Sequence, residues 1–323
     1  MNIILLLVFS LLFWVLELIY FKIADKYNII DKPNHRSSHA QITIRGGGII
    51  FPISLLVGSL YLGFNYIYFL LGLLVISIIS FIDDIKPASN KIRIVVHIMA
   101  VMLMFYQLNI YNLSWYLVIL SFIFVIGSMN AINFMDGING ITGGFALITM
   151  LSLYYINNYK FEFTNTNYLS ITIISLLIFN FFNFRKKAKC FAGDVGSVSI
   201  AFILLFFVLQ LIIKSNNLNY ISLFMLYGID TVTTILFRLI KKENVFEAHR
   251  QHFYQFLANE KKMPHLLVAI IYSLIQAVIN VILIEYSFTT PTALILSICI
   301  SLLLFTLLRF NLEGSKKLLG VKQ

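Results

Sequence analysis

Carboxylate side chains occur in three strings of this chain that could hold a phosphate-bound metal ion. Asp83 and Asp84 are adjacent in FIDDIKPASNKIR, Asp136 lies in GSMNAINFMDGINGITGG, and Asp194 stands between glycines in CFAGDVGSVSIAF. A hard cation such as Mg²⁺ takes oxygen ligands from one or two carboxylates together with substrate phosphates. One member of a crowded carboxylate pair can also acquire a raised pKa that suits it to accept a proton. The three strings therefore predict a site for a metal-bound diphosphate.

Two asparagines precede the carboxylate of the second string. Asn130, Asn133 and Asp136 are spaced three residues apart, so a continuing helix carries them near one face. The glycines that follow allow tight turns and close approach of the backbone. Such a set can gather amides and a carboxylate around a diphosphate. It can equally join helices through small residues and an asparagine hydrogen-bond network.

The other two strings also have structural alternatives. Asp194 at the start of an apolar run is compatible with an ordinary N-cap. Asp83 and Asp84 could simply end a helix, but acidic residues at a helix C-terminus oppose its dipole, so a cation or a basic partner must offset them. The candidate partners nearby in the sequence are Lys86, Lys91 and Arg93.

Imidazole and guanidinium groups are concentrated in two polar connections. NVFEAHRQHFYQFL carries His249, Arg250 and His252, whose imidazoles share one helical face and suit an anionic phosphate. The alternatives are a plain surface helix or a zinc site, although the HExxH spacing and a nearby Cys are absent. DKPNHRSSHAQITIRGGGI places His39 and Arg45 before three glycines. Its donors fit a lid or lipid-phosphate clamp, or an ordinary juxtamembrane loop.

The elements that must position these residues are membrane helices. Hydrophobic residues make up 59% of the chain, charged residues only 12%, and the mean hydropathy is +0.88, which excludes an ordinary soluble domain. Crossing roughly 30 Å of hydrocarbon takes about 20 apolar residues. We predict an all-α polytopic membrane protein, a single domain over residues 1–323, with about eleven spans near 3–22, 46–63, 66–82, 93–110, 114–130, 141–158, 168–184, 197–213, 219–238, 264–284 and 289–308.

The basic residues predict the orientation of these spans. All of the 24 lysines and arginines except Lys160 and Lys214 fall in alternate connections, which also carry the polar strings. Because short basic loops are held on the cytoplasmic side, the N-terminus is expected outside and the C-terminus in the cytoplasm. The net charge of +10 then mainly reports topology, and no nucleic-acid partner is expected.

Five strings, in order from about Asp31 to Gln255, resemble the polyprenyl-phosphate N-acetylhexosamine-1-phosphate transferases. They are RGGG, the Asp-Asp pair, NxxNxxDG, GDxGS and the His-rich last loop. HRQHFYQ and RSSH are similar to the branch that starts O-antigen and other surface glycans. The resemblance implies an enzyme of the bacterial inner membrane, with its site facing the cytoplasm. It would transfer N-acetylhexosamine 1-phosphate from a UDP-sugar to undecaprenyl phosphate with Mg²⁺, or alternatively Mn²⁺, and release UMP. Homodimers are common in such enzymes.

The resemblance also implies roles for individual residues. Asp83 and Asp84 would be the catalytic pair, one of them able to deprotonate the lipid phosphate, and Asp194 would bind the metal with Asp84. The remaining expected contacts to nucleotide, diphosphate, sugar or lipid phosphate are Asp136, His249, Arg250, His252, Asn130, Asn133, Asn139, Arg45 and His39. Asn139 departs from the family pattern, which usually has Asp there, so this position keeps its hydrogen-bonding groups but loses the charge of a carboxylate.

Two rival functions come from other classes. Asp230 lies within the ninth apolar run, where an ionisable residue is expensive and often functional, as in a transporter. The polar strings, however, gather at one membrane face and not at its midplane. An inactive scaffold of a glycan assembly complex is the other rival, and the intact carboxylates argue against it. Within the transferase reading, a covalent aspartyl-phosphate mechanism is an alternative to direct attack.

Overall fold

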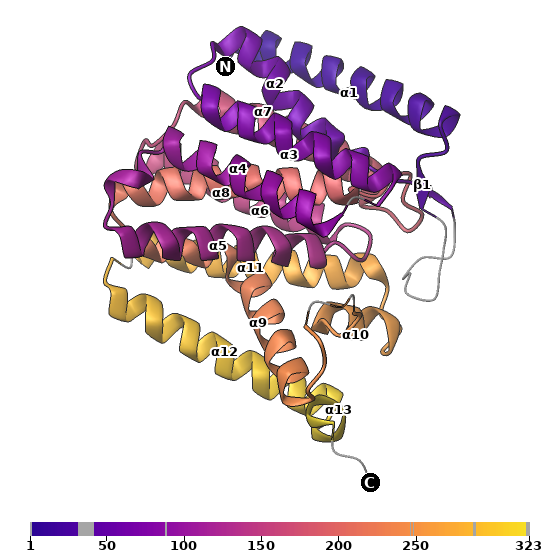
Figure 1. Ribbon diagram of the computed structural model, residues 1–323, viewed down its shortest axis with the longest axis vertical. Coiled ribbons are helices and arrows are strands. Elements are labelled where there is room, and N and C mark those ends of the chain that lie inside the picture. Colours follow the sequence, from indigo (N-terminus) through magenta and orange to yellow (C-terminus); the bar gives the residue numbers. More distant parts are fainter. Residues whose placement is uncertain are drawn as a thin grey trace.

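The chain folds into a bundle of long helices with a short two-stranded ribbon at one end (Figure 1). This computed structural model describes residues 2–31, 42–87, 89–245, 247, 249–286 and 289–320. The long helices are α1 (Ile3–Lys26), α2 (Ile50–Leu62), α3 (Ile67–Ile85), α4 (Asn90–Gln107), α5 (Trp115–Phe134), α6 (Ile141–Tyr159), α7 (Thr166–Asn183), α8 (Gly193–Ser215), α9 (Met225–Ile240), α11 (His265–Tyr286) and α12 (Pro291–Glu313). The shorter elements are β1 (Ile30–Asp31), β2 (Thr43–Ile44), η1 (Gly47–Ile49), η2 (Ile110–Asn112), η3 (Leu218–Phe224), α10 (Phe253–Asn259) and α13 (Ser315–Leu319).

Each of the eleven predicted apolar ranges overlaps one long helix, so the all-α class is confirmed. Within the described residues, eight segments are long and apolar enough to cross a membrane. Helix α2 has only 13 residues, while α4 and α6 are long enough but outside this set. Eleven spans and the placement of the two termini therefore stay predictions.

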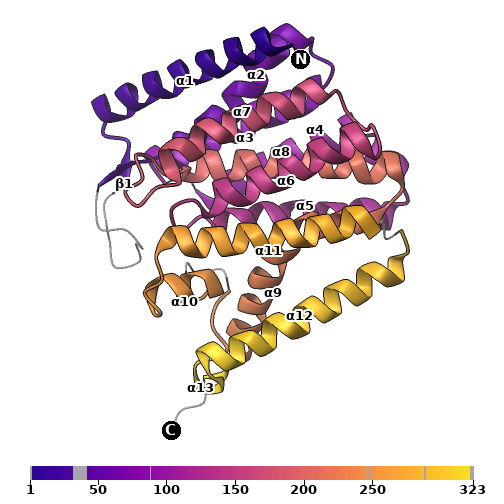
Figure 2. The same cartoon turned by 180° about the vertical axis from the view of Figure 1, so that it is seen from behind.

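Helix α8 is the centre of the bundle. It packs against α2, α3, α5 and α6, and 94% of its most apolar stretch is buried, compared with 11% for α12 and 22% for α1. A helix that is apolar all round is stable where neighbours cover it. The apolar outer faces of α1 and α12, on opposite edges in Figures 1 and 2, are surfaces that lipid would cover.

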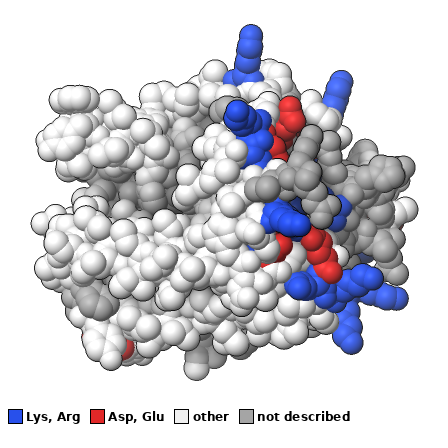
Figure 3. All heavy atoms as spheres, turned by 90° about the horizontal axis from the view of Figure 1, so that it is seen from below, with Lys and Arg blue, Asp and Glu red and all other residues white. Residues whose placement is uncertain are grey.

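Charged side chains gather at one end of the bundle. In the face that Figure 3 shows, Lys, Arg, Asp and Glu lie mainly at the end where Figure 1 places β1 and α10, and most of the flank is uncharged. Strands β1 and β2 pair antiparallel there, with Ile30 opposite Ile44. Helix α9 crosses the other helices steeply and ends near the same end (Figure 2).

Candidate active site

Asp84 connects three elements at the charged end. It lies in the last turn of α3, and its carboxylate accepts the Arg45 Nε–H at 2.6 Å and the backbone N–H groups of Asp194 at 2.8 Å and Val195 at 2.9 Å. Those amides open α8, where a negative charge is favoured by the helix dipole. The cost of an acid at the end of α3 is thus offset by the start of α8 and by a guanidinium, and the Asp84 side chain is 0% exposed.

The two neighbouring carboxylates are more accessible. Asp83 pairs with Arg93, with 2.9 Å between Oδ2 and Nη1, and Asp194 lies 3.8 Å from both Arg45 Nη2 and Arg93 Nη2. The Asp194 side chain is 21% exposed and in hydrogen-bonding contact with Asp83. Arg93 was the correct candidate among the basic residues proposed to offset the acidic pair. Three carboxylates and two guanidinium groups therefore share one small region.

Glycines allow the RGGG string to reach the start of α8. The Gly47 N–H donates to Phe191 O at 2.8 Å, and the Gly48 N–H donates to Ala192 O at 3.1 Å. A Cβ at Gly48 would lie 2.3 Å from the Gly196 Cα, so any side chain there would collide with backbone. This close contact fixes the position of the residue that precedes the glycines, Arg45, beside the carboxylates.

The asparagine string joins α5 to α8 and to the basic connection. Ser197 Oγ donates to Asn133 Oδ1 at 2.6 Å. Asn139 is buried, and its Nδ2 donates to the carbonyl oxygens of Arg185 at 3.0 Å and Lys186 at 3.4 Å. Asn139 thus ties the turn to the basic run, and its predicted substrate contact is untested. Asn130 is partly exposed in the last turns of α5.

Asp136 lies in the turn between α5 and α6, close enough to Asp84 and Arg45 for their charges to act on it. Burial raises the pKa of Asp136 to about 6, and the nearby Asp84 charge raises it further. The residue as a whole is partly exposed. It is therefore an acid that can change protonation close to neutral pH.

The His-rich segment, residues 249–257, packs against this turn. Tyr254 Oη donates to Phe134 O at 3.2 Å, and a Cβ at Gly137 would lie 2.3 Å from the same hydroxyl. The His249 ring lies 6.3 Å from Phe134 and 5.0 Å from the His252 ring, centroid to centroid. The structure thus brings all five strings together at one end of the bundle.

The two histidines differ in what they can contact. His252 is 1% exposed, while His249 and Arg250 are partly exposed. Burial, then the His252 imidazole and Arg238, lowers the pKa of His249 to about 4, so its ring is neutral at pH 7. In this segment Arg250, which is always charged, is the better partner for an anion, and His249 can act as a neutral hydrogen-bonding group.

The residues at the carboxylate cluster suit a hard divalent cation. Asp83 and Asp194 offer oxygen donors, and two carboxylates in contact need a shared proton or a cation between them. Asp84, also predicted as a ligand, uses its oxygens on Arg45 and the α8 amides. Over the described ranges, no group of three His, Cys, Asp or Glu residues is arranged to hold a metal by itself, so substrate phosphates would have to complete the coordination.

One predicted residue cannot be placed, and one residue bonded to the His-rich segment was not predicted from the sequence. His39 lies outside the described residues, so its predicted contact is untested. Arg309 was not predicted to take part, yet it is buried and bonded to the His-rich segment through Gln251 O at 2.9 Å. The available signal was a charged residue near the end of an apolar run, which is expensive there and so calls for a partner.

Comparison with known proteins shows which family this chain belongs to. Residues 66–212 match glycosyl transferase family 4. A phospho-N-acetylmuramoyl-pentapeptide-transferase of Dictyoglomus turgidum is 32% identical over 225 residues, 62% of this chain and 70% of the relative. A probable undecaprenyl-phosphate N-acetylglucosaminyl 1-phosphate transferase of Bacillus subtilis is 25% identical over 88% of this chain and 82% of its own length. The corresponding Escherichia coli K12 enzyme, an undecaprenyl-phosphate alpha-N-acetylglucosaminyl 1-phosphate transferase, is 26% identical over 84% and 80%. With its five strings gathered at one site, this chain belongs to glycosyl transferase family 4.

Proposed function

We propose that this protein transfers N-acetylhexosamine 1-phosphate from a UDP-N-acetylhexosamine to undecaprenyl phosphate, and so starts a cell-surface glycan such as O-antigen. The relatives' names support the lipid acceptor and the phosphosugar group. The observation that carries the proposal is the cluster of Asp83, Asp84 and Asp194 with Arg45 and Arg93 at the charged end of an apolar bundle. A donor that is soluble and an acceptor that is lipid can meet only at such a surface.

In the proposed reaction an oxygen of the lipid phosphate attacks the β-phosphorus of the UDP-sugar. The new P–O bond forms while the bond from that phosphorus to the oxygen bridging the two phosphates breaks, and UMP leaves with that oxygen and its charge. The problem is one of positioning and charge, because both reacting groups are anionic. Arg45 and Arg93 are placed to draw phosphates to the carboxylates, and Asp83 can take the proton of the lipid phosphate.

Mg²⁺, or Mn²⁺ in its place, would be held by Asp194 with substrate oxygens, and would neutralise charge on the transferred phosphoryl group. Asp84 fixes the positions of Arg45 and of the start of α8 through its hydrogen bonds to the Arg45 guanidinium and the Asp194 amide. Asn133 and Asp136 border the same region and are suited to contact the nucleotide diphosphate, together with Asn130. His249 and Arg250 approach from the last connection and suit the sugar or its phosphate.

The topology proposal follows from the same charged end. We place it at the cytoplasmic side of a bacterial inner membrane, with eleven spans and the N-terminus outside, because Figure 3 shows the basic side chains gathered there. UDP-sugars are made in that compartment. A homodimer is part of the proposal and can be tested by light scattering in detergent. The transporter rival is not favoured, since Asp230 is bonded to protein backbone and side chains.

The test is UMP release from purified protein with Mg²⁺, undecaprenyl phosphate and a panel of UDP-N-acetylhexosamines. Asp83→Asn is expected to lose activity. The matched control is Glu285→Gln, the same acid-to-amide change at the other end of the bundle, where Glu285 pairs with Lys160 at 3.2 Å; it should keep activity. UMP that forms without lipid, or that persists in Asp83→Asn, would contradict the proposal.

A further inference from the structure

Asp230 is a fully buried carboxylate inside an apolar helix, and it is used to hold the His-rich segment. It accepts the Tyr272 hydroxyl at 2.7 Å, the Phe253 N–H at 2.9 Å, the Thr234 hydroxyl at 3.3 Å and the Tyr254 N–H at 3.4 Å. A buried charge is stable only if such donors satisfy it. Two of the donors are backbone amides of α10, so helix α9 holds α10 directly.

The same carboxylate also lies beside the histidines. His252 Nδ1 lies 3.5 Å from Asp230 Oδ1, and the His252 ring stacks on His249 at 5.0 Å. Because His252 is 1% exposed, it faces Asp230 and protein, while His249 beyond it is partly exposed. The order from membrane interior to site is thus Asp230, His252, His249.

Arg309 of α12 is a second anchor for the segment. Its Nη2 donates to Gln251 O at 2.9 Å, and its Nη1 donates to the hydroxyls of Thr234 at 2.8 Å and Thr233 at 3.1 Å. Thr234 in turn donates to Asp230. Arg309 is 1% exposed on a helix that otherwise shows apolar residues outward. The segment is therefore held on both sides by charges inside the bundle.

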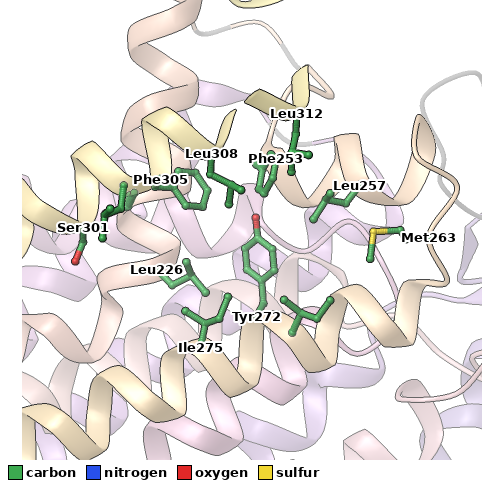
Figure 4. Close-up of a pocket in the computed structure, with 13 residues that line it drawn as sticks. Leu226, Phe253, Leu257, Met263, Tyr272, Ile275, Ser301, Phe305, Leu308 and Leu312 are labelled. Atoms are coloured by element: carbon green, nitrogen blue, oxygen red, sulfur yellow. The ribbon is translucent and has the colours of Figure 1, made fainter. Parts of the chain in front are cut away.

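One side of α10 is not closely packed. An apolar cavity of about 430 Å³ lies beneath it, lined by α9, α10, α11 and α12. Figure 4 shows Phe253 on its wall and the Tyr272 hydroxyl pointing toward Phe253 and Leu308. Tyr254 and Phe256 are buried on the other sides of α10, so packing positions the helix there, and the polar bonds to Asp230 hold it beside the cavity.

On the basis of the proposed function, we infer that Asp230 is a positioning residue, which with His252 and Arg309 sets the place of His249 and Arg250 against the Asp136 turn. It touches no substrate itself. Its loss should release the segment from the site while the carboxylate cluster at α3 and α8 stays assembled.

The test compares Asp230→Asn with Asn280→Leu in purified full-length protein. Asn280 is also buried, and its hydrogen bonds go to Gln276 of α11 at 2.7 Å and Ser152 of α6 at 2.9 Å, which are not part of the His-rich segment. Hydrogen exchange over residues 250–257 and steady-state kinetics are measured for both. In Asp230→Asn we expect exchange there to quicken at least about 10-fold and kcat to fall about 100-fold, with KM for the lipid nearly unchanged. Asn280→Leu should alter neither.

Tyr272→Phe, which removes one donor to the same carboxylate, is the milder second variant and should change both readouts in the same direction by less. Wild-type exchange and kcat in Asp230→Asn would overturn the inference, as would equal losses in Asn280→Leu, because these would indicate general instability. If the wild-type protein releases no UMP, the proposed function fails, whereas the exchange comparison still decides whether Asp230 anchors the segment.

Discussion

Replacing Asp84 by Asn is expected to destabilise the fold as well as abolish activity, whereas Asp83→Asn should abolish activity alone. Asp84 accepts three donors, and its side chain is fully buried. Asn keeps the shape but has one oxygen in place of two, and its amide group would face an N–H donor. Asp83 has the Arg93 pair at 2.9 Å, and Arg93 is 28% exposed.

The magnitude follows from these contacts. Hydrogen bonds to a charged group contribute about 1.5–3 kcal/mol each, and removing one partner of a buried ion pair costs about 3–5 kcal/mol. Arg45 is 34% exposed, so water recovers part of this loss. We therefore expect Asp84→Asn to lower the free energy of unfolding by about 3 kcal/mol, and Asp83→Asn by about 1 kcal/mol or less.

The assay is thermal unfolding of both variants in the same detergent, without substrate, beside UMP release. Each kcal/mol corresponds to a shift of the melting temperature of about 2–4 °C in a protein of moderate size. Equal melting temperatures for the two variants would refute the structural role given to Asp84. So would an Asp84→Asn protein as stable as the wild type.

Three further predictions concern the glycines, the turn and the metal. Gly48→Ala should prevent stable folding, because its Cβ would lie 2.3 Å from the Gly196 Cα, whereas Gly127→Ala, with nothing within 4 Å, should fold normally; expression and melting in detergent check both. The pKa of Asp136 is raised from 3.8 to about 6, so between those values the folded state holds a proton that the unfolded chain has lost, and stability falls as pH rises. From pH 4 to 7 the melting temperature of Asp136→Asn should rise relative to that of the wild type. A difference in melting temperature that does not change with pH would contradict this. Chelation should abolish UMP release, and Asp194→Asn should need about 10-fold more Mg²⁺ for half-maximal rate; an unchanged Mg²⁺ requirement would count against Asp194 as a ligand.

The helices and the gathering of the polar strings could be predicted from the sequence. Apolar runs report a local property, the length needed to cross a bilayer, so each predicted range coincided with a helix. The partners of individual side chains could not be predicted in this way. Asp84 meets the Val195 amide 111 residues away, and Arg309 meets Gln251, because such contacts depend on how distant helices pack. Asn139 is another example. The sequence shows an Asn where the family usually has Asp, but it does not show that the Asn139 side-chain amide donates to the backbone carbonyl of Arg185.

The nucleotide released in the reaction tests the central claim most directly. Purified protein in lipid nanodiscs would receive UDP-N-acetylhexosamine, undecaprenyl phosphate and Mg²⁺, with products quantified by mass spectrometry. Transfer of a sugar 1-phosphate predicts one UMP for each undecaprenyl diphosphate sugar formed, and neither product with Asp83→Asn. Release of UDP with a monophosphate-linked sugar, or no lipid product from folded wild-type protein with any donor in the panel, would contradict the account.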